Sequence, residues 1–187
     1  MTDPCIDPGA ESAAHLATEL PEGHVVRTFM EEHQRILSHL DRLEELVGET
    51  PDGGTPEGRG RLEEIQGIAA HLIGAEPHHQ REEQVLFPAL EQRGVSGPPA
   101  VMTAEHVELR ALKHAVADRT AEVRDGDAAQ WATLRREALA LVELLREHIG
   151  KEDTVLYPMA LRVIRDGTEW AELRRRCDAI GYCCQGH

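Results

Sequence analysis

Residues 78–88 read His78-His79-Gln80-Arg81-Glu82-Glu83-Gln84-Val85-Leu86-Phe87-Pro88, and residues 148–158 read His148-Ile149-Gly150-Lys151-Glu152-Asp153-Thr154-Val155-Leu156-Tyr157-Pro158. When the two proline ends are aligned without a gap, His78 falls on His148 and Glu82 falls on Glu152. Each copy is therefore a histidine followed four residues later by a glutamate. On an α-helix these positions lie one turn apart on the same face, so each copy presents an imidazole beside a carboxylate. Such a pair is able to ligate a metal ion.

The first copy contains a second pair with the same spacing, His79 and Glu83, one residue out of register. Because a regular helix turns one face toward a core, only one of the two registers is expected there. The alignment with the second copy favours His78 and Glu82. His79 and Glu83 remain the alternative.

The composition indicates one all-α domain. The chain has 187 residues, of which 41% are hydrophobic and only 3% aromatic, and its apolar residues recur at helical rather than strand period. A formal net charge of −14 argues against binding nucleic acid or an anionic membrane surface, since both attract basic patches. No apolar run approaches the length of a membrane span, and residues 1–4 lack the opening of a signal peptide. We expect a cytoplasmic protein without a membrane partner.

Glycine and proline clusters divide the chain into four long helical segments and two ends. Apolar spacing predicts helices over about residues 24–47, 61–92, 98–123 and 128–164. Pro77 predicts a break just before His78, and Pro158 predicts a bend in the last of these helices. Four such helices pack as an antiparallel up-down bundle over residues 22–165, expected to be a monomer. Residues 1–21 form an N-terminal extension, and residues 166–187 form a short C-terminal helix and tail.

Each long helix contributes one histidine to its apolar stripe. His33 and His106 lie in phase in the first and third helices, as His78 and His148 do in the second and fourth. A lone histidine in an apolar stripe is usually a hydrogen-bonded core residue, so the two nearby carboxylates are what favours a metal site. The secondary candidates are His24 and His71 as additional ligands, and Tyr157, which either supplies a phenol near the metals or packs as Phe87 does. His39 and His114 are off the stripes, so His39 is expected at a flank or at the surface and His114 is expected to face solvent.

The charges of Glu82 and Glu152 need compensation. Burying an ionised carboxylate costs on the order of several kcal/mol unless it is paired. The stripes offer no arginine or lysine, and the only two lysines, Lys113 and Lys151, are out of phase. Two cations would offset the cost, and four imidazoles with two carboxylates suit non-haem iron, with manganese or zinc less favoured. With both carboxylates bridging, each metal keeps an open position for a small molecule.

Four cysteines, Cys5, Cys177, Cys183 and Cys184, all lie near the ends of the chain. Adjacent cysteines are poorly placed for a structural disulfide, so we expect free thiols. A redox or metal-binding role for the tail is the alternative.

The motifs resemble the hemerythrin-like cation-binding family over about residues 22–165. The resemblance rests on His33 in Glu-Glu-His, the two repeats with their Leu-(Phe/Tyr)-Pro endings, and His106 in Ala-Glu-His, one element per helix. It implies a four-helix bundle with an oxo- or hydroxo-bridged di-iron centre. Oxygen-carrying members have a second histidine where this chain has Arg110, and a carboxylate five residues after the last histidine. Asp153 meets that spacing and competes with Glu152, which the internal repeat favours.

The arrangement is similar instead to bacterial di-iron proteins credited with iron-sulfur cluster repair and nitric oxide reduction, and to actinobacterial hemerythrin-like proteins linked to peroxide and nitric oxide stress. The resemblance implies an oxidoreductase-like protein that reacts with hydrogen peroxide, oxygen or nitric oxide in stress defence. The sequence does not indicate its electron donor. Two alternatives stay open: a module that binds or senses oxygen, nitric oxide or iron without turnover, and an iron donor for cluster repair.

Overall fold

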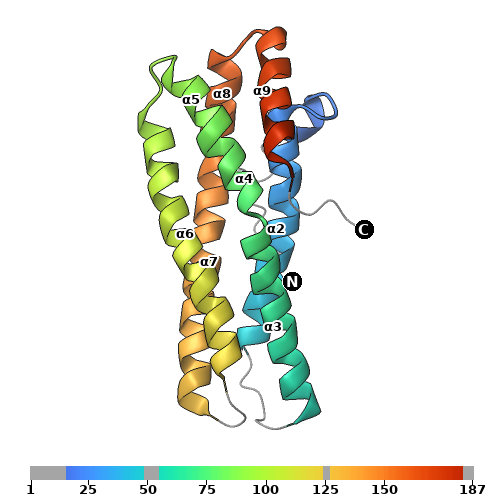
Figure 1. Ribbon diagram of the computed structural model, residues 1–187, viewed down its shortest axis with the longest axis vertical. Helices are drawn as coiled ribbons and strands as arrows, with labels where there is room; N and C mark the ends of the chain where they lie inside the picture. Colours follow the sequence, from blue (N-terminus) through green and yellow to red (C-terminus); the bar gives the residue numbers. More distant parts are fainter. Residues whose placement is uncertain (1–15, 49–54, 124–126, 183–187) are drawn as a thin grey trace, which may run out of the picture.

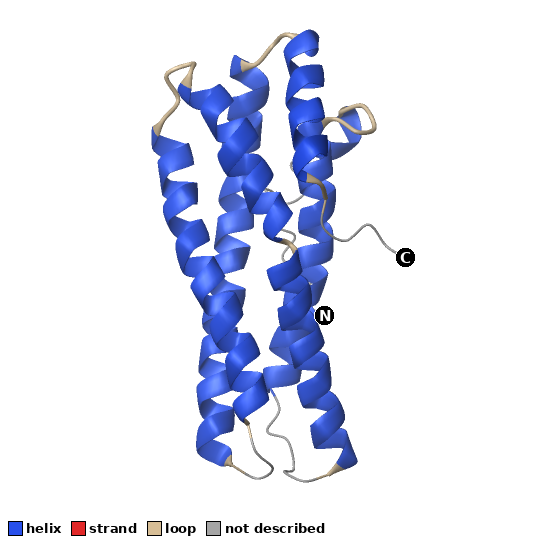
Figure 2. Cartoon of the chain, in the orientation of Figure 1, coloured by secondary structure: helices blue, strands red, loops and turns tan. Residues whose placement is uncertain are grey.

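The computed structural model describes residues 16–48, 55–123 and 127–182, and every regular element within those ranges is a helix (Figures 1 and 2). The all-α prediction is confirmed. Expectations about residues 1–15, the loop at residues 49–54, and Cys5, Cys183 and Cys184 fall outside these ranges. None of the helices so described is both long and apolar enough to cross a lipid bilayer.

Four long helices form the body of the bundle: α2 (Val25–Gly48), α3 (Pro56–Gly74), α6 (Gly97–Glu122) and α7 (Ala128–Lys151). Contacts join α2 to α3, α3 to α6, α6 to α7, and α7 to α2, so the four helices close a ring. Figure 1 shows that successive members of this ring run in alternating directions. Short connections at the two ends make this the natural arrangement for consecutive helices.

A polar layer crosses the bundle between two apolar clusters. Along α2, Phe29 and Met30 belong to one cluster, Ile36 and Leu40 belong to the other, and His33 lies between them. We call each side of the bundle a rod: α2, α3 with its continuation to residue 91, α6, and α7 with its continuation to residue 163. In the other three rods, too, the histidine (His78, His106 or His148) lies between residues of the two apolar clusters. Each buried apolar side chain of this size contributes about 1.5–3 kcal/mol to folding, and together the clusters keep water from both sides of the layer.

The second rod is segmented where the first repeat lies. α3 ends at Gly74, and α4 (Glu76–Arg81) restarts with Pro77 in its first turn, which confirms the break expected before His78. The fourth rod continues through its repeat without a break but changes helix type there. The remaining segments of the two rods are the π-helical turn η1 (Glu82–Leu86) with α5 (Phe87–Glu91), and the π-helical turn η2 (Glu152–Leu156) with α8 (Tyr157–Val163).

Both π-helical turns have the same cause. Proline has no backbone N–H, and its ring clashes with the carbonyl four residues earlier, so Pro88 and Pro158 do not continue a regular α-helix. The residue before each proline instead donates its N–H to the carbonyl five residues back, which is that of Glu82 in the first copy and Glu152 in the second. The sequence predicted only a bend at Pro158, whereas the structure widens the helix at both prolines.

A last helix, α9 (Gly167–Ile180), lies against α2 and α4 (Figure 1). Its Arg176 donates to the Gln84 carbonyl at 2.7 Å. This carbonyl lies four residues before Pro88, which has no N–H to offer it. Cys177, expected to be a free thiol, is buried and forms no disulfide, and burial raises its pKa to about 11.

Candidate metal centre

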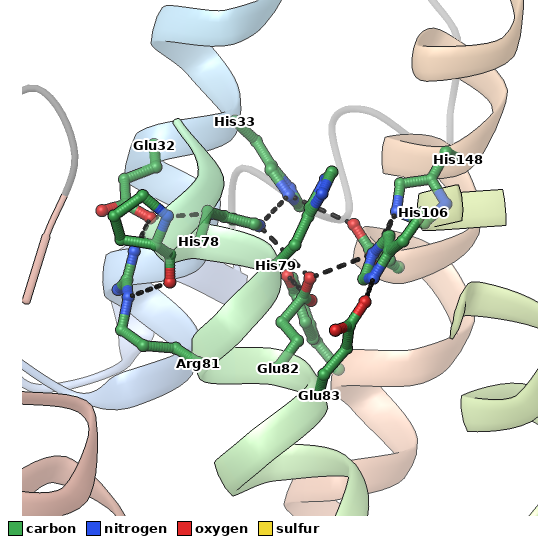
Figure 3. A network of polar contacts seen from close by, with 12 residues as sticks. Glu32, His33, His78, His79, Arg81, Glu82, Glu83, His106 and His148 are labelled. Atoms are coloured by element: carbon green, nitrogen blue, oxygen red, sulfur yellow. Dashed lines mark hydrogen bonds and ion pairs between the residues drawn. The ribbon is translucent and has the colours of Figure 1, made fainter. Parts of the chain in front are cut away.

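The polar layer brings together the six side chains that the sequence singled out (Figure 3). One histidine comes from each of α2, α4, α6 and α7, and the first residue of each π-helical turn is a glutamate. All six are at most 2% exposed: His33, His78, Glu82, His106, His148 and Glu152.

Each of the four histidines also contacts a carboxylate through Nδ1, on the side of the ring that faces away from Glu82 and Glu152. We call these four groups the outer carboxylates. The Nδ1 atoms lie 2.7–2.8 Å from these partners: His33 from Asp153, His78 from Glu32, His106 from Glu83, and His148 from Glu105. An Nδ1–H that donates to a carboxylate fixes both the orientation and the tautomer of the ring. In the neutral ring, Nε2 then carries only a lone pair and is left to the interior of the layer.

Three of the four outer carboxylates also bind a cation. The pairs are Arg81 with Glu32 at 2.5 Å, Arg110 with Glu83 at 3.0 Å, and Lys151 with Glu105. Within the described residues, Asp153 contacts His33 but no lysine or arginine. Among the described residues, a lysine or arginine therefore pairs with every outer carboxylate except Asp153, which lies behind His33.

These pairs correct the expectation that the interior holds no basic side chain. Arg81 is 1% exposed, and its guanidinium lies over the rings of Phe29 and Tyr182. Lys113, predicted to be out of phase, is also buried, and it lies close enough to His79 to influence its pKa. The periodicity of a single helix misses Arg81 because α4 is covered on more than one face, by Glu32 of α2 on one side and by α9 on another.

The inward atoms of the layer are crowded and unsatisfied. One half of the layer contains His33 and His78, and the other half contains His106 and His148. In each half the two Nε2 atoms face each other, at 3.1 Å in the first and 3.0 Å in the second. Two lone pairs repel at this distance unless a proton or a metal ion lies between them. Glu82 Oε2 and both carboxylate oxygens of Glu152 are buried without a hydrogen-bond partner.

The two central glutamates reach both halves. Glu152 places Oε1 3.0 Å from His148 Nε2 and Oε2 3.3 Å from His33 Nε2. Glu82 Oε2 lies 3.4 and 3.6 Å from one Nε2 atom of each half. These contacts are within ion-pair distance but lack hydrogen-bond geometry. Carboxylates so placed are able to bridge two cations, one in each half.

In the metal-free layer, protons balance the two glutamates. Burial alone would lower the pKa of His33, but Asp153 and Glu152 outweigh it and raise that pKa to about 10. Burial is likewise outweighed at His106, where Glu152 and Glu82 raise the pKa to about 10. Although burial opposes it, the surrounding imidazoles hold the pKa of Glu152 well below its usual range. Metal ions entering the layer would displace these protons, because the ligating form of histidine is neutral.

Groups of converging ligand atoms in each half of the layer could hold a metal ion. Two ligand atoms that lie about 2.1 Å from a metal and at right angles are about 3.0 Å apart, which matches the separation of the facing Nε2 atoms in each half. Imidazole nitrogens with carboxylate oxygens form a donor set for transition metals such as iron. The ligand atoms lie within 4.8 Å of one another in each of two groups, one of His33, His78 and Glu152, the other of Glu82, His106, His148 and Glu152.

A family model described as the hemerythrin HHE cation binding domain matches residues 24–160. The chain belongs to the hemerythrin family. Its curated relatives include proteins named iron-sulfur cluster repair protein YtfE from Yersinia pseudotuberculosis serotype IB (strain PB1/+) and from Yersinia pestis (strain Pestoides F), each 32% identical over 148 residues. Each match covers 74% of this chain and 63% of the relative, so the chain spans less than two thirds of the length of these relatives.

The hemerythrin layer buries His79 as well as His78, although Glu83, the carboxylate of the alternative register, stays partly exposed. His79 is 4% exposed, its ring stacks on that of His106 with the centroids 3.9 Å apart, and its Nδ1 atom has no hydrogen-bond partner. Its ligand atom lies within 4.8 Å of those of His106 and His148. Adjacent residues point about 100° apart on a helix, so on the enclosed α4 His78 faces α2 while His79 faces α6 and α7. Burial, together with the charge of Lys113, lowers the pKa of His79 well below its usual value and keeps it neutral.

Glu83, Asp153 and Tyr157 support the layer from outside its centre. Glu83 and Asp153 each accept an Nδ1–H from a layer histidine, so Asp153 and Glu152 have separate places rather than competing for one. Tyr157 donates to Glu82 Oε1 at 2.8 Å. Burial and the nearby carboxylates raise the pKa of Tyr157 well above its usual value, so the phenol stays a donor.

The structure does not bring His24 or His71 to the hemerythrin layer. The His71 ring stacks on that of His39, with the centroids 4.0 Å apart, where α3 lies beside α2. The His24 ring lies tilted against that of Trp170 of α9, with the centroids 4.5 Å apart. Because α3 ends and α4 restarts, the two helices do not share the phase that would have aligned His71 with the motif. His39 is half-buried, which agrees with a flank position, and His114, outside the layer, is exposed as expected.

Proposed function

We propose that the layer holds two iron ions and that the protein is a non-haem di-iron protein. One observation carries this proposal: two pairs of facing Nε2 atoms share two central carboxylates whose inward oxygens have no hydrogen-bond partner. The ligands proposed are His33 and His78 in one half, His106 and His148 in the other, and Glu82 with Glu152 across both. Iron is favoured over manganese or zinc by the mixed nitrogen and oxygen donors and by the family to which the chain belongs.

The chain's own groups position the ligands and exclude water. The outer carboxylates fix the imidazole rings with Nε2 pointing inward. The phenol of Tyr157 fixes one oxygen of Glu82, which leaves the other directed at both halves. When bound, non-haem iron supplies one-electron redox chemistry and open coordination positions for small molecules.

The function proposed is reaction with hydrogen peroxide, oxygen or nitric oxide in defence against oxidative or nitrosative stress. The experiment measures oxygen evolved from hydrogen peroxide by the iron-loaded chain, with nitric oxide consumption measured in parallel. Glu82→Ala removes a central carboxylate and should abolish both activities. Glu147→Ala, an exposed glutamate next to His148, is the matched control and should leave both unchanged. Equal rates for wild type and Glu82→Ala would contradict turnover at this centre.

A second candidate function is donation of iron to damaged iron-sulfur clusters. The observation that favours it is the name of the Yersinia relatives, iron-sulfur cluster repair protein. Donation requires a labile metal, so reduced, iron-loaded protein should lose iron to a strong chelator. Retention of both irons under these conditions would contradict this candidate.

A further inference from the structure

The two halves of the layer are supported unequally. The outer carboxylates of His78, His106 and His148 each bind a cation on their far side. Asp153, behind His33, is paired with no lysine or arginine in the part of the chain that the structure describes. His33 is therefore held by a carboxylate that is itself fixed on one side only.

Asp153 also borders a cavity of about 270 Å³. The cavity lies between the helical turn at residues 16–19 and α2, and Gln34 lines it as well. Arg27 is on the same wall, but its Nε donates to Glu31 at 2.7 Å, and its Nη1 donates to a backbone carbonyl at 3.0 Å. Among the described residues that line the cavity, Arg27 is the one basic side chain, and it is engaged elsewhere, while Asp153 borders the open space.

The opposite half has an additional nitrogen donor. His79 brings a ligand atom within 4.8 Å of those of His106 and His148, and its buried Nδ1 atom lies 3.9 Å from Glu76 Oε2 without a hydrogen-bond partner. This half therefore offers three imidazoles, whereas the half with His33 and His78 offers two.

We propose that the metal position between His33 and His78 is the exchangeable one, and that the ion enters and leaves along the cavity beside Asp153. This proposal rests on the two-metal centre proposed above. Asp153 is free to turn into the cavity, because nothing buried depends on its outer oxygen, and His33 then loses the contact that orients its ring. The other outer carboxylates are held in place, since turning away would leave a cation without its partner.

The experiment follows release of iron from protein loaded anaerobically with two ferrous ions, using excess ferrozine as the probe. Wild type should release one ion fast and one slowly. Gln34→Arg places a guanidinium beside Asp153 in the cavity, and a charge-assisted hydrogen bond there should slow the fast phase about tenfold. Gln34→Met fills similar space without charge and should leave the fast phase unchanged. Gln34 is exposed, so both variants should fold.

A third variant tests the assignment of the halves. Lys151→Met removes the cation that anchors Glu105 behind His148, and it should accelerate the slow phase while the fast phase stays the same. The proposal is overturned if Gln34→Arg has no effect, if Gln34→Met slows release equally, or if Lys151→Met accelerates the fast phase. A wild-type protein that loads fewer than two irons contradicts the two-metal centre, whereas two irons leaving at a single rate contradict only the exchangeable position.

Discussion

At the scale of single residues, Arg81 and Glu32 form a buried ion pair that holds His78 from behind. Replacing one partner of a buried pair leaves the other charge uncompensated. Arg81→Met should therefore lower the free energy of unfolding of the metal-free protein by about 3–5 kcal/mol, as measured by urea denaturation. Arg93→Met, which breaks an exposed pair with Glu169, is the control and should cost less than about 1 kcal/mol.

A second substitution tests the cause of that loss. Adding Glu32→Gln to Arg81→Met removes the uncompensated charge but keeps an acceptor for His78 Nδ1, so the double variant should recover part of the lost free energy. Equal losses in Arg81→Met and Arg93→Met, or no recovery in the double variant, would show that the buried charge is not what stabilises this corner of the layer.

At the scale of the helical elements, each π-helical turn begins at a central glutamate, and a proline follows two residues after the turn ends. We treat the glutamate, the turn and the proline as one unit. In the first unit, the Gln84 carbonyl cannot receive an N–H from Pro88 and is served by Arg176 of α9 at 2.7 Å. Arg176→Met should cost about 0.5–1.5 kcal/mol in the free energy of unfolding. Arg175→Met, whose guanidinium contacts only its own helix through Glu172, should cost little. Indistinguishable losses would mean that α9 does not support the turn through this contact.

The periodicity of the sequence predicts the bundle, the break at Pro77 and the six inward side chains, because each depends on the pattern within one helix. The outer carboxylates could not be predicted in the same way. Glu32 and Glu105 precede the histidine of their own helix by one residue but accept from a histidine of another helix. Such contacts depend on how neighbouring helices are aligned, which the apolar pattern of one helix does not predict. His79 was kept only as the alternative to His78, on the assumption that α4 has one buried face, whereas both histidines are buried.

At the scale of the whole molecule, stability should depend on pH through the metal-free layer. The pKa values of His33 and His106 are raised from 6.5 to about 10 by the carboxylates that face them. The stabilisation from their charged forms is present in full below pH 6.5 and is lost as the pH rises to about 10. The thermal midpoint of metal-free protein should therefore fall across this window. The metal-loaded protein is the control, and it should change less because its ligating imidazoles are already neutral. A thermal midpoint of the metal-free protein that stays constant or rises with pH would contradict the claim that the charged forms of His33 and His106 stabilise the layer.

The account depends most on the claim that the layer is a two-metal site. The direct test is the number of iron ions per chain, measured by mass spectrometry after anaerobic loading at neutral pH and removal of free metal. Wild type should retain two ions, and Glu152→Ala should retain one or none, because Glu152 reaches both halves of the layer. A wild-type chain that retains no iron, or a number that Glu152→Ala leaves unchanged, would contradict the claim.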